Sequence, residues 1–433
     1  MLDIQFIRDN KDLVIEKSKQ KGCDVEVARL LDLDEKRKSL IQEIEASRAK
    51  INLQTKGFEG KVPSEEQRAV VRTIKESISS NEKLLENIEA DYLKTLKTIP
   101  NMPLDNVPIG SSEEENKIEK QVGEKLQFAF EPKTHWQIAQ HRGWLDKERA
   151  GKVAGARFAY ILGDLVKLQL AIMQFVIDKL TNESVIGQII KDNNLDLPAV
   201  PFIPVLPPYM IKTEIYDAMD RLEPRDDRYK IEGEELWLQG SAEHTIGSML
   251  AGEVIDEKQD GEVQRYLGYA TSFRKEAGTY GKDTEGIIRM HQFDKLEMES
   301  FSVPEKGLGE FKLMIALQEY LTSQLGLPYQ ILNKCTADIG KPNASGVDLE
   351  VWMPGQNKYR ETHTADYMTD YQARRLKTRI RRKDGSVQLV HTNDATAFAL
   401  GRIMVAIIEN YQTEDMRVVV PDVLKDYMKK EIL

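Results

Sequence analysis

Two stretches near the N-terminus carry hydrophobic residues at alternating spacings of three and four. The first has its seam positions at Leu30, Leu33, Arg37, Leu40, Ile44, Ser47 and Ile51. The second has them at Val71, Ile74, Ile78, Asn81, Leu85, Ile88 and Tyr92. Between them, Thr55 to Pro63 contains two glycines and a proline, which interrupt a helix. Two equal heptad seams around one turn predict an antiparallel helical hairpin, a coiled-coil arm over residues 27–97. At about 1.5 Å per residue, the paired seams are at least about 33 Å long.

The rest of the chain mixes predicted helices and strands. A short helix within residues 1–25 precedes the arm, and a proline- and glycine-containing linker at about residues 100–112 follows it. Helical spacing of apolar residues predicts helices over residues 154–180 and 400–411, among extended segments. No regular βαβ spacing, GxGxxG or GxxxxGK[ST] supports a Rossmann or P-loop nucleotide site. We therefore predict two domains, 1–105 and 106–433, the second of α+β class with an antiparallel sheet flanked by helices.

Composition narrows the class of protein. Hydrophobic residues make up 41% and charged residues 30% of the chain, which is ordinary for a globular protein with long charged helices. No apolar run approaches the roughly 20 residues that span a bilayer, and no signal-peptide core is present, so we expect no membrane association. Cys23 and Cys335 support neither a disulfide framework nor a zinc site. A reducing cytoplasm fits this composition.

The arm is electrically neutral on a chain whose net charge is −10. One interpretation is a solvated coiled-coil surface with interspersed ion pairs. The other is that cations near the tip contact RNA phosphates. The candidates for that contact are Arg48, Lys50, Lys56, Lys61, Arg68 and Arg72.

The stretch from Phe273 to Met298 concentrates charge around a glycine-bearing turn and predicts two strands joined by a loop. On the second strand, one face would carry Arg289, His291, Phe293, Lys295 and Glu297. Opposite charges around an aromatic ring are costly in a core but suit a pocket for a charged planar ligand. The alternative is a salt-bridged surface hairpin with an ordinary core phenylalanine.

This hairpin resembles motif 2 of the class II aminoacyl-tRNA synthetases, and its amino-acid sequence is similar to that of the seryl-tRNA synthetase family. Further segments resemble that family in the same order: MLDIQFIRDN, HWQIAQHRGWLDKERAGKVAGARF, YRETHTADYMTDYQARR and ALGRIMVAIIENYQ. The resemblance covers nearly the whole chain. It implies the class II catalytic fold, ATP as a substrate, Mg²⁺ and a homodimer. No zinc is expected, because Cys23 and Cys335 lack a zinc-type spacing.

The resemblance also implies roles for individual residues. Arg274 matches the arginine that holds the amino-acid carboxylate and the α-phosphate, and Glu297 matches the acid that recognises the serine hydroxyl. The residues implied to bind serine are Ser241, Glu243, Arg274, Glu297, Thr364, Asp394 and Thr396. Asparagine is common in the family where this chain has Asp394, and the resemblance leaves open whether the exchange alters amino-acid choice.

ATP and its metal are assigned in the same way. The residues implied to bind ATP are Arg274, Glu276, Arg289, Phe293, Lys295, Glu361 and Arg402. Phe293 matches the ring stacked on adenine, and Glu361 and Thr364 match the residues that serve Mg²⁺. Arg274, Glu361 and Arg402 are the implied catalytic residues, because they position the reactants and offset charge. Besides Asp394, further residues depart from the family pattern: His244, His363, Ala365, Asp366 and Tyr367.

The implied activity is activation of serine by ATP and transfer of the seryl group to tRNA(Ser), with tRNA(Sec) left open. In the family, the N-terminal arm binds the long variable arm of the tRNA. The basic run from Arg374 to Lys383 either meets the acceptor stem or is a solvated hairpin. The segment Pro201–Lys212, with Pro207 and Pro208, resembles the dimer-forming motif 1 but also reads as an edge strand.

Two rival functions stay open at this point. A synthetase-like paralogue would adenylate a small amino acid and charge a carrier protein, but it would have no need of a long arm. A coiled-coil RNA-binding protein with an inactive catalytic domain is the second rival. Against that rival, Arg274, Glu297, Glu361 and Arg402 are all retained.

Overall fold

A computed structural model describes residues 1–56, 63–277 and 285–433. The chain forms two compact units, Met1–Met102 and Pro103–Leu433. Most of the predicted turn at the end of the arm, including Lys61, and residues 278–284 of the predicted hairpin loop lie outside the described residues. Within the described ranges, no helix has both the length and the apolar character needed to cross a membrane.

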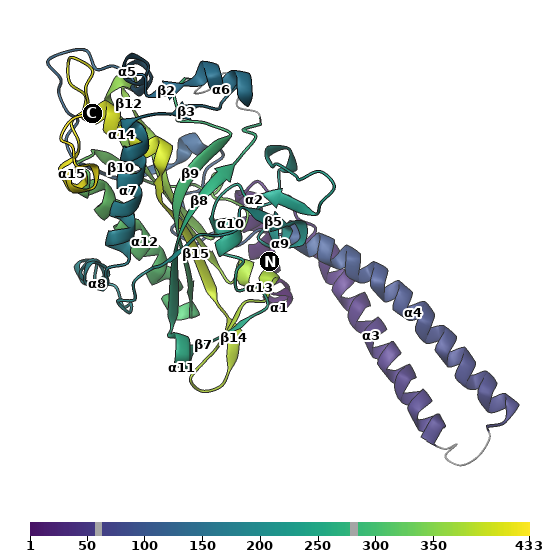
Figure 1. Cartoon of the computed structure of the whole chain (residues 1–433). Coiled ribbons are helices and arrows are strands. Elements are labelled where there is room, and N and C mark those ends of the chain that lie inside the picture. The colour runs from purple at the N-terminus through teal and green to yellow at the C-terminus, as the bar shows by residue number, and fades with distance from the viewer. Residues whose placement is uncertain (57–62, 278–284) are drawn as a thin grey trace. The chain divides into compact units, whose positions relative to one another are not determined.

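The first unit is helical. Its helices are α1 (Ile4–Asp9), α2 (Lys11–Gln20), α3 (Val27–Lys56) and α4 (Glu65–Thr98). The first 25 residues therefore hold two helices, not the single one expected, because the chain breaks at Asn10. Figure 1 shows α3 and α4 side by side along the arm, which confirms the predicted helical hairpin. Ion pairs join Arg37 to Glu89 and Arg48 to Glu82, so the two helices run in opposite directions.

The second unit is built on an eight-stranded sheet, which confirms the predicted α+β class. Its strands, in spatial order, are β1 (Lys117–Val122), β10 (Tyr329–Asn333), β11 (Ser345–Met353), β12 (Lys358–Thr369), β15 (His391–Ala399), β9 (Gln292–Ser302), β8 (Val263–Phe273) and β4 (Ile203–Val205). All neighbours pair antiparallel except β4 with β8. The proline-bracketed β4 is thus an edge strand, the position at which a missing backbone donor costs least.

Smaller sheets and helices complete the unit. The short strands are β2 (Leu145–Asp146), β3 (Tyr160–Ile161), β5 (Met210–Lys212), β6 (Leu236–Leu238), β7 (Val254–Asp256), β13 (Arg379–Arg381) and β14 (Val387–Leu389). The α-helices are α5 (His135–Arg142), α6 (Lys147–Val153), α7 (Asp164–Leu180), α8 (Glu183–Asp192), α9 (Thr213–Ala218), α10 (Glu243–Ile246), α11 (Glu257–Asp260), α12 (Pro304–Gln324), α13 (Tyr371–Leu376), α14 (Leu400–Asn410) and α15 (Asp422–Met428). Single 3-10 turns lie at Glu113–Glu115, Arg225–Asp227 and Pro354–Gln356.

The core lies between the sheet and helices α7, α12 and α14 (Figure 1). The predicted final helix is confirmed as α14. The helix predicted over 154–180 is wrong in its first ten residues, because these contain a turn and the strand β3. On β9, Leu296 and Met298 join this core, so the alternate residues Lys295, Glu297 and Glu299 face the other side of the sheet. That other side holds the candidate site.

One ion pair is completely buried in this unit. Arg265 of β8 and Glu310 of α12 have no exposed side-chain surface, and two nitrogen–oxygen contacts of 2.8 and 2.6 Å join them. The same guanidinium also donates to the backbone carbonyls of Pro198 and Val200, just before β4. The pair therefore connects the sheet, the long helix and the chain leading into the edge strand.

Candidate active site

A cavity of about 660 Å³ opens on the side of the sheet away from the core. It brings together residues from opposite parts of the second unit, among them Glu243, Arg274, Lys295, Glu361 and Arg402. An adjoining pocket shares several of these residues and adds Glu276, Phe293 and Thr396. The cavity is thus lined by most of the residues that the resemblance singles out.

A β-bulge in β12 shapes one side of this cavity. His363 pairs with Leu349 and Glu361 pairs with Glu350, so Thr362 is an extra residue in the strand. Glu361 and Thr364 are three residues apart and would lie on opposite faces of a regular strand, but the bulge turns both toward the cavity. The Oγ1 atom of Thr364 is buried near the Asp348 carboxyl and forms no well-aligned hydrogen bond among the described residues. Such an oxygen suits a ligand or a metal.

Arg402 and Glu361 form an ion pair across the cavity wall. The Arg402 guanidinium lies 3.0 Å from Glu361 Oε1 and donates to the Glu361 backbone carbonyl at 3.0 Å. Burial alone would raise the pKa of the Glu361 carboxyl, but Arg402 and Lys334 hold it below its usual value. The Glu361 carboxyl is therefore ionised, and the adjacent Arg402 guanidinium could bind a phosphate group of a ligand.

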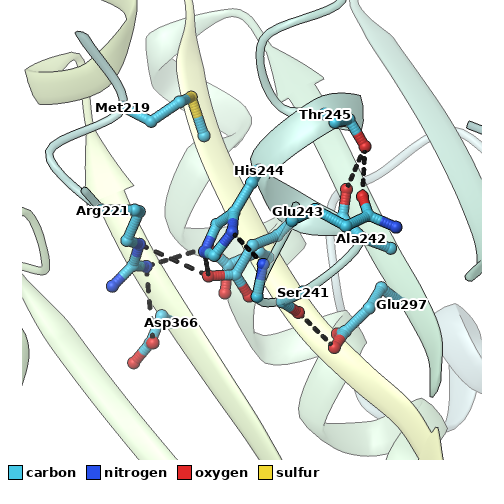
Figure 2. A network of polar contacts seen from close by, with 12 residues as sticks. Met219, Arg221, Ser241, Ala242, Glu243, His244, Thr245, Glu297 and Asp366 are labelled. Atoms are coloured by element: carbon cyan, nitrogen blue, oxygen red, sulfur yellow. Dashed lines mark hydrogen bonds and ion pairs between the residues drawn. The ribbon is translucent and has the colours of Figure 1, made fainter. Parts of the chain in front are cut away.

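Glu297 lies directly behind the cavity wall in a small polar cluster. Ser241 donates to Glu297 Oε1 at 2.9 Å (Figure 2), and Lys295 pairs with the same carboxylate. Thr396 Oγ1 is 3.5 Å from this oxygen. The second oxygen, Oε2, is buried and finds no hydrogen-bond donor within the described part of the chain. Burial raises the pKa of Glu297, and Lys295 opposes that shift. A hydroxyl or ammonium group from a ligand would satisfy Oε2.

The hairpin differs from its prediction at the start of the second strand. β9 begins at Gln292, so Arg289 and His291 precede the strand and are not part of its face. The residues before Gln292 form turns, and Arg289 pairs there with Glu276 at 2.5 Å. Phe293 does belong to the strand, and the guanidinium carbon of Arg274 lies 5.4 Å from the centre of its ring. These side chains line a cavity, which favours the interpretation as a pocket over that as an ordinary surface hairpin.

Arg274 is held by the loop that carries Ser241. Its Nε donates to the Gly240 carbonyl at 2.9 Å, and the Gly240 amide donates to His244 Nδ1 at 3.1 Å. This bond makes Nδ1 an acceptor, so the proton of the neutral ring is on Nε2. Burial lowers the pKa of His244 to about 4, and Nε2 faces Glu243 Oε1 at 3.4 Å. His244, whose role the sequence left open, is a neutral support for the loop.

The residues of β12 that depart from the family pattern lie on two faces of the strand, one toward the core and one toward the cavity. His363 is buried against the ring of Phe398 in the core, and burial lowers its pKa to about 3. Tyr367, also in the core, hydrogen-bonds to His391. Asp366 faces the cavity, as does Thr364. Only one of the four unusual residues in this segment can therefore affect the site directly.

Comparison with known proteins identifies the family. Residues 1–103 match the family model described as "Seryl-tRNA synthetase N-terminal domain". Residues 228–411 match the model described as "tRNA synthetase class II core domain (G, H, P, S and T)". A serine--tRNA ligase of Citrifermentans bemidjiense is 35% identical over 433 residues, covering 99% of this chain and 98% of its own. The chain belongs to the seryl-tRNA synthetase family. A Caldanaerobacter subterraneus serine--tRNA ligase is 37% identical over 440 residues, covering 100% of this chain and 99% of its own.

Similarity to a solved structure supports the same family assignment. The seryl-tRNA synthetase of Pyrococcus horikoshii, in complex with ATP, has a TM-score of 0.88 and 35% identity and covers 100% of this chain and 99% of its own. The class II fold expected of a seryl-tRNA synthetase is therefore confirmed.

The basic run after β12 is mostly engaged within the protein. Five of its seven cations form ion pairs with acidic residues: Arg374, Arg375, Arg381, Arg382 and Lys383. The Arg382 guanidinium pairs with both Glu257 and Glu305. This pairing favours the solvated-hairpin interpretation over a dedicated acceptor-stem surface.

Glu299 is a residue that sequence reasoning missed. It continues the site face of β9 past Glu297 and is 1% exposed, and neither of its carboxyl oxygens has a hydrogen-bond partner among the described residues. Burial raises its pKa well above the usual value, and Asp394 and Glu243 act in the same direction. Burial therefore favours the protonated form of Glu299 in the native state. Only the register of β9 against β15, which places it opposite Asp394, could have indicated this.

Replacing Glu299 with glutamine should make stability less dependent on pH. A raised native pKa means that the native state binds more protons than the unfolded state above the unfolded pKa, so stability falls as pH rises toward the native pKa. The variant should lack this fall, which is at most about 1.4 kcal/mol per pH unit. Urea unfolding at pH 5 to 8 would measure it. A difference between variant and wild type that stays constant over this range would contradict the assignment.

Proposed function

We propose that the protein is a serine--tRNA ligase that activates serine with ATP and transfers the seryl group to the 3′-terminal adenosine of tRNA(Ser). The observation that supports this most directly is the shared cavity. Arg274, Glu361 and Arg402 line it, and Glu297 lies one contact behind it through Lys295. These residues lie far apart in the sequence but converge on one space large enough for a nucleotide.

The first step needs positioning and charge stabilisation rather than a protein nucleophile. The serine carboxylate attacks the α-phosphorus of ATP, and pyrophosphate leaves. Arg274, anchored by Gly240, would hold both the carboxylate and the α-phosphate, a task that suits a guanidinium fork. Arg402 would exchange part of its contact with Glu361 for the γ-phosphate. Phe293, beneath Arg274, would stack on the adenine ring.

Serine would be selected by its hydroxyl. Glu297 Oε2 would accept a hydrogen bond from that hydroxyl, with Ser241 and Thr396 holding the other oxygen. Alanine would leave these buried groups unsatisfied, a penalty of about 10⁴ or more in rate. Threonine must be excluded by volume, because one methyl group gives only about 10- to 200-fold discrimination.

Glu361 and Thr364 would hold Mg²⁺ together with the phosphates of ATP. Among the described residues, no group of three or more histidine, cysteine or acidic side chains is arranged to bind a metal ion by itself. Mg²⁺ commonly uses one or two protein oxygens and takes the rest from phosphates and water, so two ligands fit. The bound ion would neutralise charge on the phosphates. The Glu361 carboxylate and the Thr364 hydroxyl supply suitable oxygen atoms.

A homodimer is the expected assembly. Around the edge strand and the segment resembling motif 1, several apolar side chains are exposed: Val200, Ile203, Leu206, Tyr209 and Met210. Leu206 is 79% exposed. An apolar patch of this kind is unfavourable in water and favours contact with a second copy.

The arm should serve tRNA binding and not serine activation. Replacing residues 44–80 with a short Gly-Ser turn keeps Glu43 and Asn81, whose side chains lie 3.3 Å apart. This variant should keep serine-dependent pyrophosphate exchange. Its charging of tRNA(Ser) should fall roughly 10²- to 10³-fold, because several phosphate contacts are lost.

Aminoacylation and exchange assays on the same preparation test this prediction. Unchanged tRNA charging would favour a paralogue that acts on a carrier protein. Failure of the intact protein to bind a seryl-adenylate analogue in calorimetry would favour an inactive RNA-binding protein. Charging of tRNA(Sec) can be measured alongside tRNA(Ser).

A further inference from the structure

Arg221 follows α9 and reaches the amino-acid end of the cavity. Its side chain is 14% exposed, lines the cavity and contacts acids from three separate elements. Its Nε lies 3.4 Å from Glu243 Oε1 of α10, and its Nη2 lies 3.2 Å from Asp394 of β15 and 3.8 Å from Asp366 of β12 (Figure 2 shows Glu243 and Asp366). It also donates to Asn343 Oδ1 at 3.3 Å.

The acids around Arg221 outnumber the cations. The register places Asp366 opposite Asp394 and Asp394 opposite Glu299, so three carboxyl groups cross neighbouring strands in one row. Glu243 and Glu297 lie beside this row, and all five acids are buried or nearly so. The nearby cations are Arg221, Lys295 and, at 4.0 Å from Asp366, Lys334. Like charges at this spacing are unfavourable unless a cation or a proton separates them.

Arg221 also orients one particular carboxylate. Both Arg221 and His244 contact Oε1 of Glu243, and Figure 2 shows them converging on it from one side. Although burial alone would raise the pKa of Glu243, Arg221 and His244 hold it well below its usual value. Glu243 is therefore an ionised acid that lines the cavity and is held at Oε1 by two partners.

We propose that Arg221 is a positioning residue for the amino-acid substrate: it fixes Glu243 so that the second oxygen meets the substrate ammonium group. This inference rests on the proposed function and deepens it. It also assigns a role to two departures from the family pattern. Asp394 and Asp366 serve as ion-pair partners of Arg221, so their negative charge is compensated within the protein and does not act on the ligand. The choice of serine is therefore unchanged by them.

Replacing Arg221 with glutamine tests the proposal. In serine-dependent pyrophosphate exchange, the KM for serine should rise about 10- to 100-fold, the effect of losing a charge-assisted contact. The KM for ATP should stay within about twofold, because the side-chain partners of Arg221 described above are not among the residues assigned to ATP. Arg221→Lys should recover part of the loss, since it restores the charge without the fork.

Two further variants separate positioning from general damage. Arg225→Gln, in the same loop, is the matched control: Arg225 is 54% exposed, pairs with Glu223 and should leave both KM values unchanged. In the double variant Arg221→Gln with Asp394→Asn, one repelling acid is gone. Its KM for serine should therefore fall at least about threefold below that of Arg221→Gln.

The outcomes are distinct. An unchanged KM for serine in Arg221→Gln, or equal rises for serine and ATP with a lowered unfolding temperature, would overturn the proposal and leave Arg221 a structural residue. Absence of serine-dependent exchange in the wild type would instead contradict the proposed function itself.

Discussion

Replacing Glu297 with alanine should abolish serine-dependent pyrophosphate exchange. The expected loss is about 10⁴-fold or more, the discrimination seen when a buried group loses its hydroxyl partner. Within the described part of the chain, Glu297 Oε2 is buried without a donor, so a bound serine hydroxyl would satisfy it. Removing the carboxylate also leaves Lys295 and Ser241 without their shared partner.

This second effect requires a control for folding. Glu297→Gln keeps the shape and a hydrogen-bond acceptor but removes the charge, so it should retain more of the fold than alanine. Thermal unfolding and ATP binding, measured on both variants, separate a lost serine contact from a collapsed site. Near-normal exchange in Glu297→Ala would refute the role assigned to this residue.

The largest expected loss of stability follows from Glu310→Ala. This change leaves Arg265 charged and completely buried without its carboxylate partner. Breaking one half of a buried ion pair typically costs about 3–5 kcal/mol in the free energy of unfolding. The remaining carbonyl partners, Pro198 and Val200, cannot neutralise the charge. Chemical denaturation monitored by circular dichroism measures this change.

Glu305→Ala is the matched control on the same helix. Glu305 is 62% exposed and pairs with Arg382 at the surface, so its loss should cost no more than about 1 kcal/mol. Equal destabilisation by the two variants would show that the Arg265–Glu310 pair contributes no more than a surface pair.

Local patterns predicted much of the fold. The heptads of the arm lie on two contacting helices, because periodic apolar positions can be buried only along one seam. The apolar helix after Arg402 became α14 in the core for the same reason. The convergence of Arg274, Glu361 and Arg402 followed from the resemblance alone, since nothing in their spacing along the chain reveals a shared cavity.

Other features depend on register and could not be predicted from local patterns. The bulge at Thr362 decides that Thr364 and Asp366 face the cavity while His363 enters the core. The contacts of Arg221 could not be predicted either, because its acidic partners come from three elements that are distant in the sequence, α10, β12 and β15. The hairpin strand begins later than alternation suggested, because the residues before Gln292 form turns that bring Arg289 to Glu276.

Pyrophosphate exchange measured with each of the twenty amino acids is the most direct test of the cavity as a serine-activating site. We expect exchange with serine to exceed that with alanine by about 10⁴-fold or more. Threonine should give little exchange, and both Glu297→Ala and Arg221→Gln should weaken the serine signal. Preference for another amino acid, or exchange with none of the twenty, would contradict the assignment of Glu297, Arg274 and Arg402 to seryl-adenylate formation.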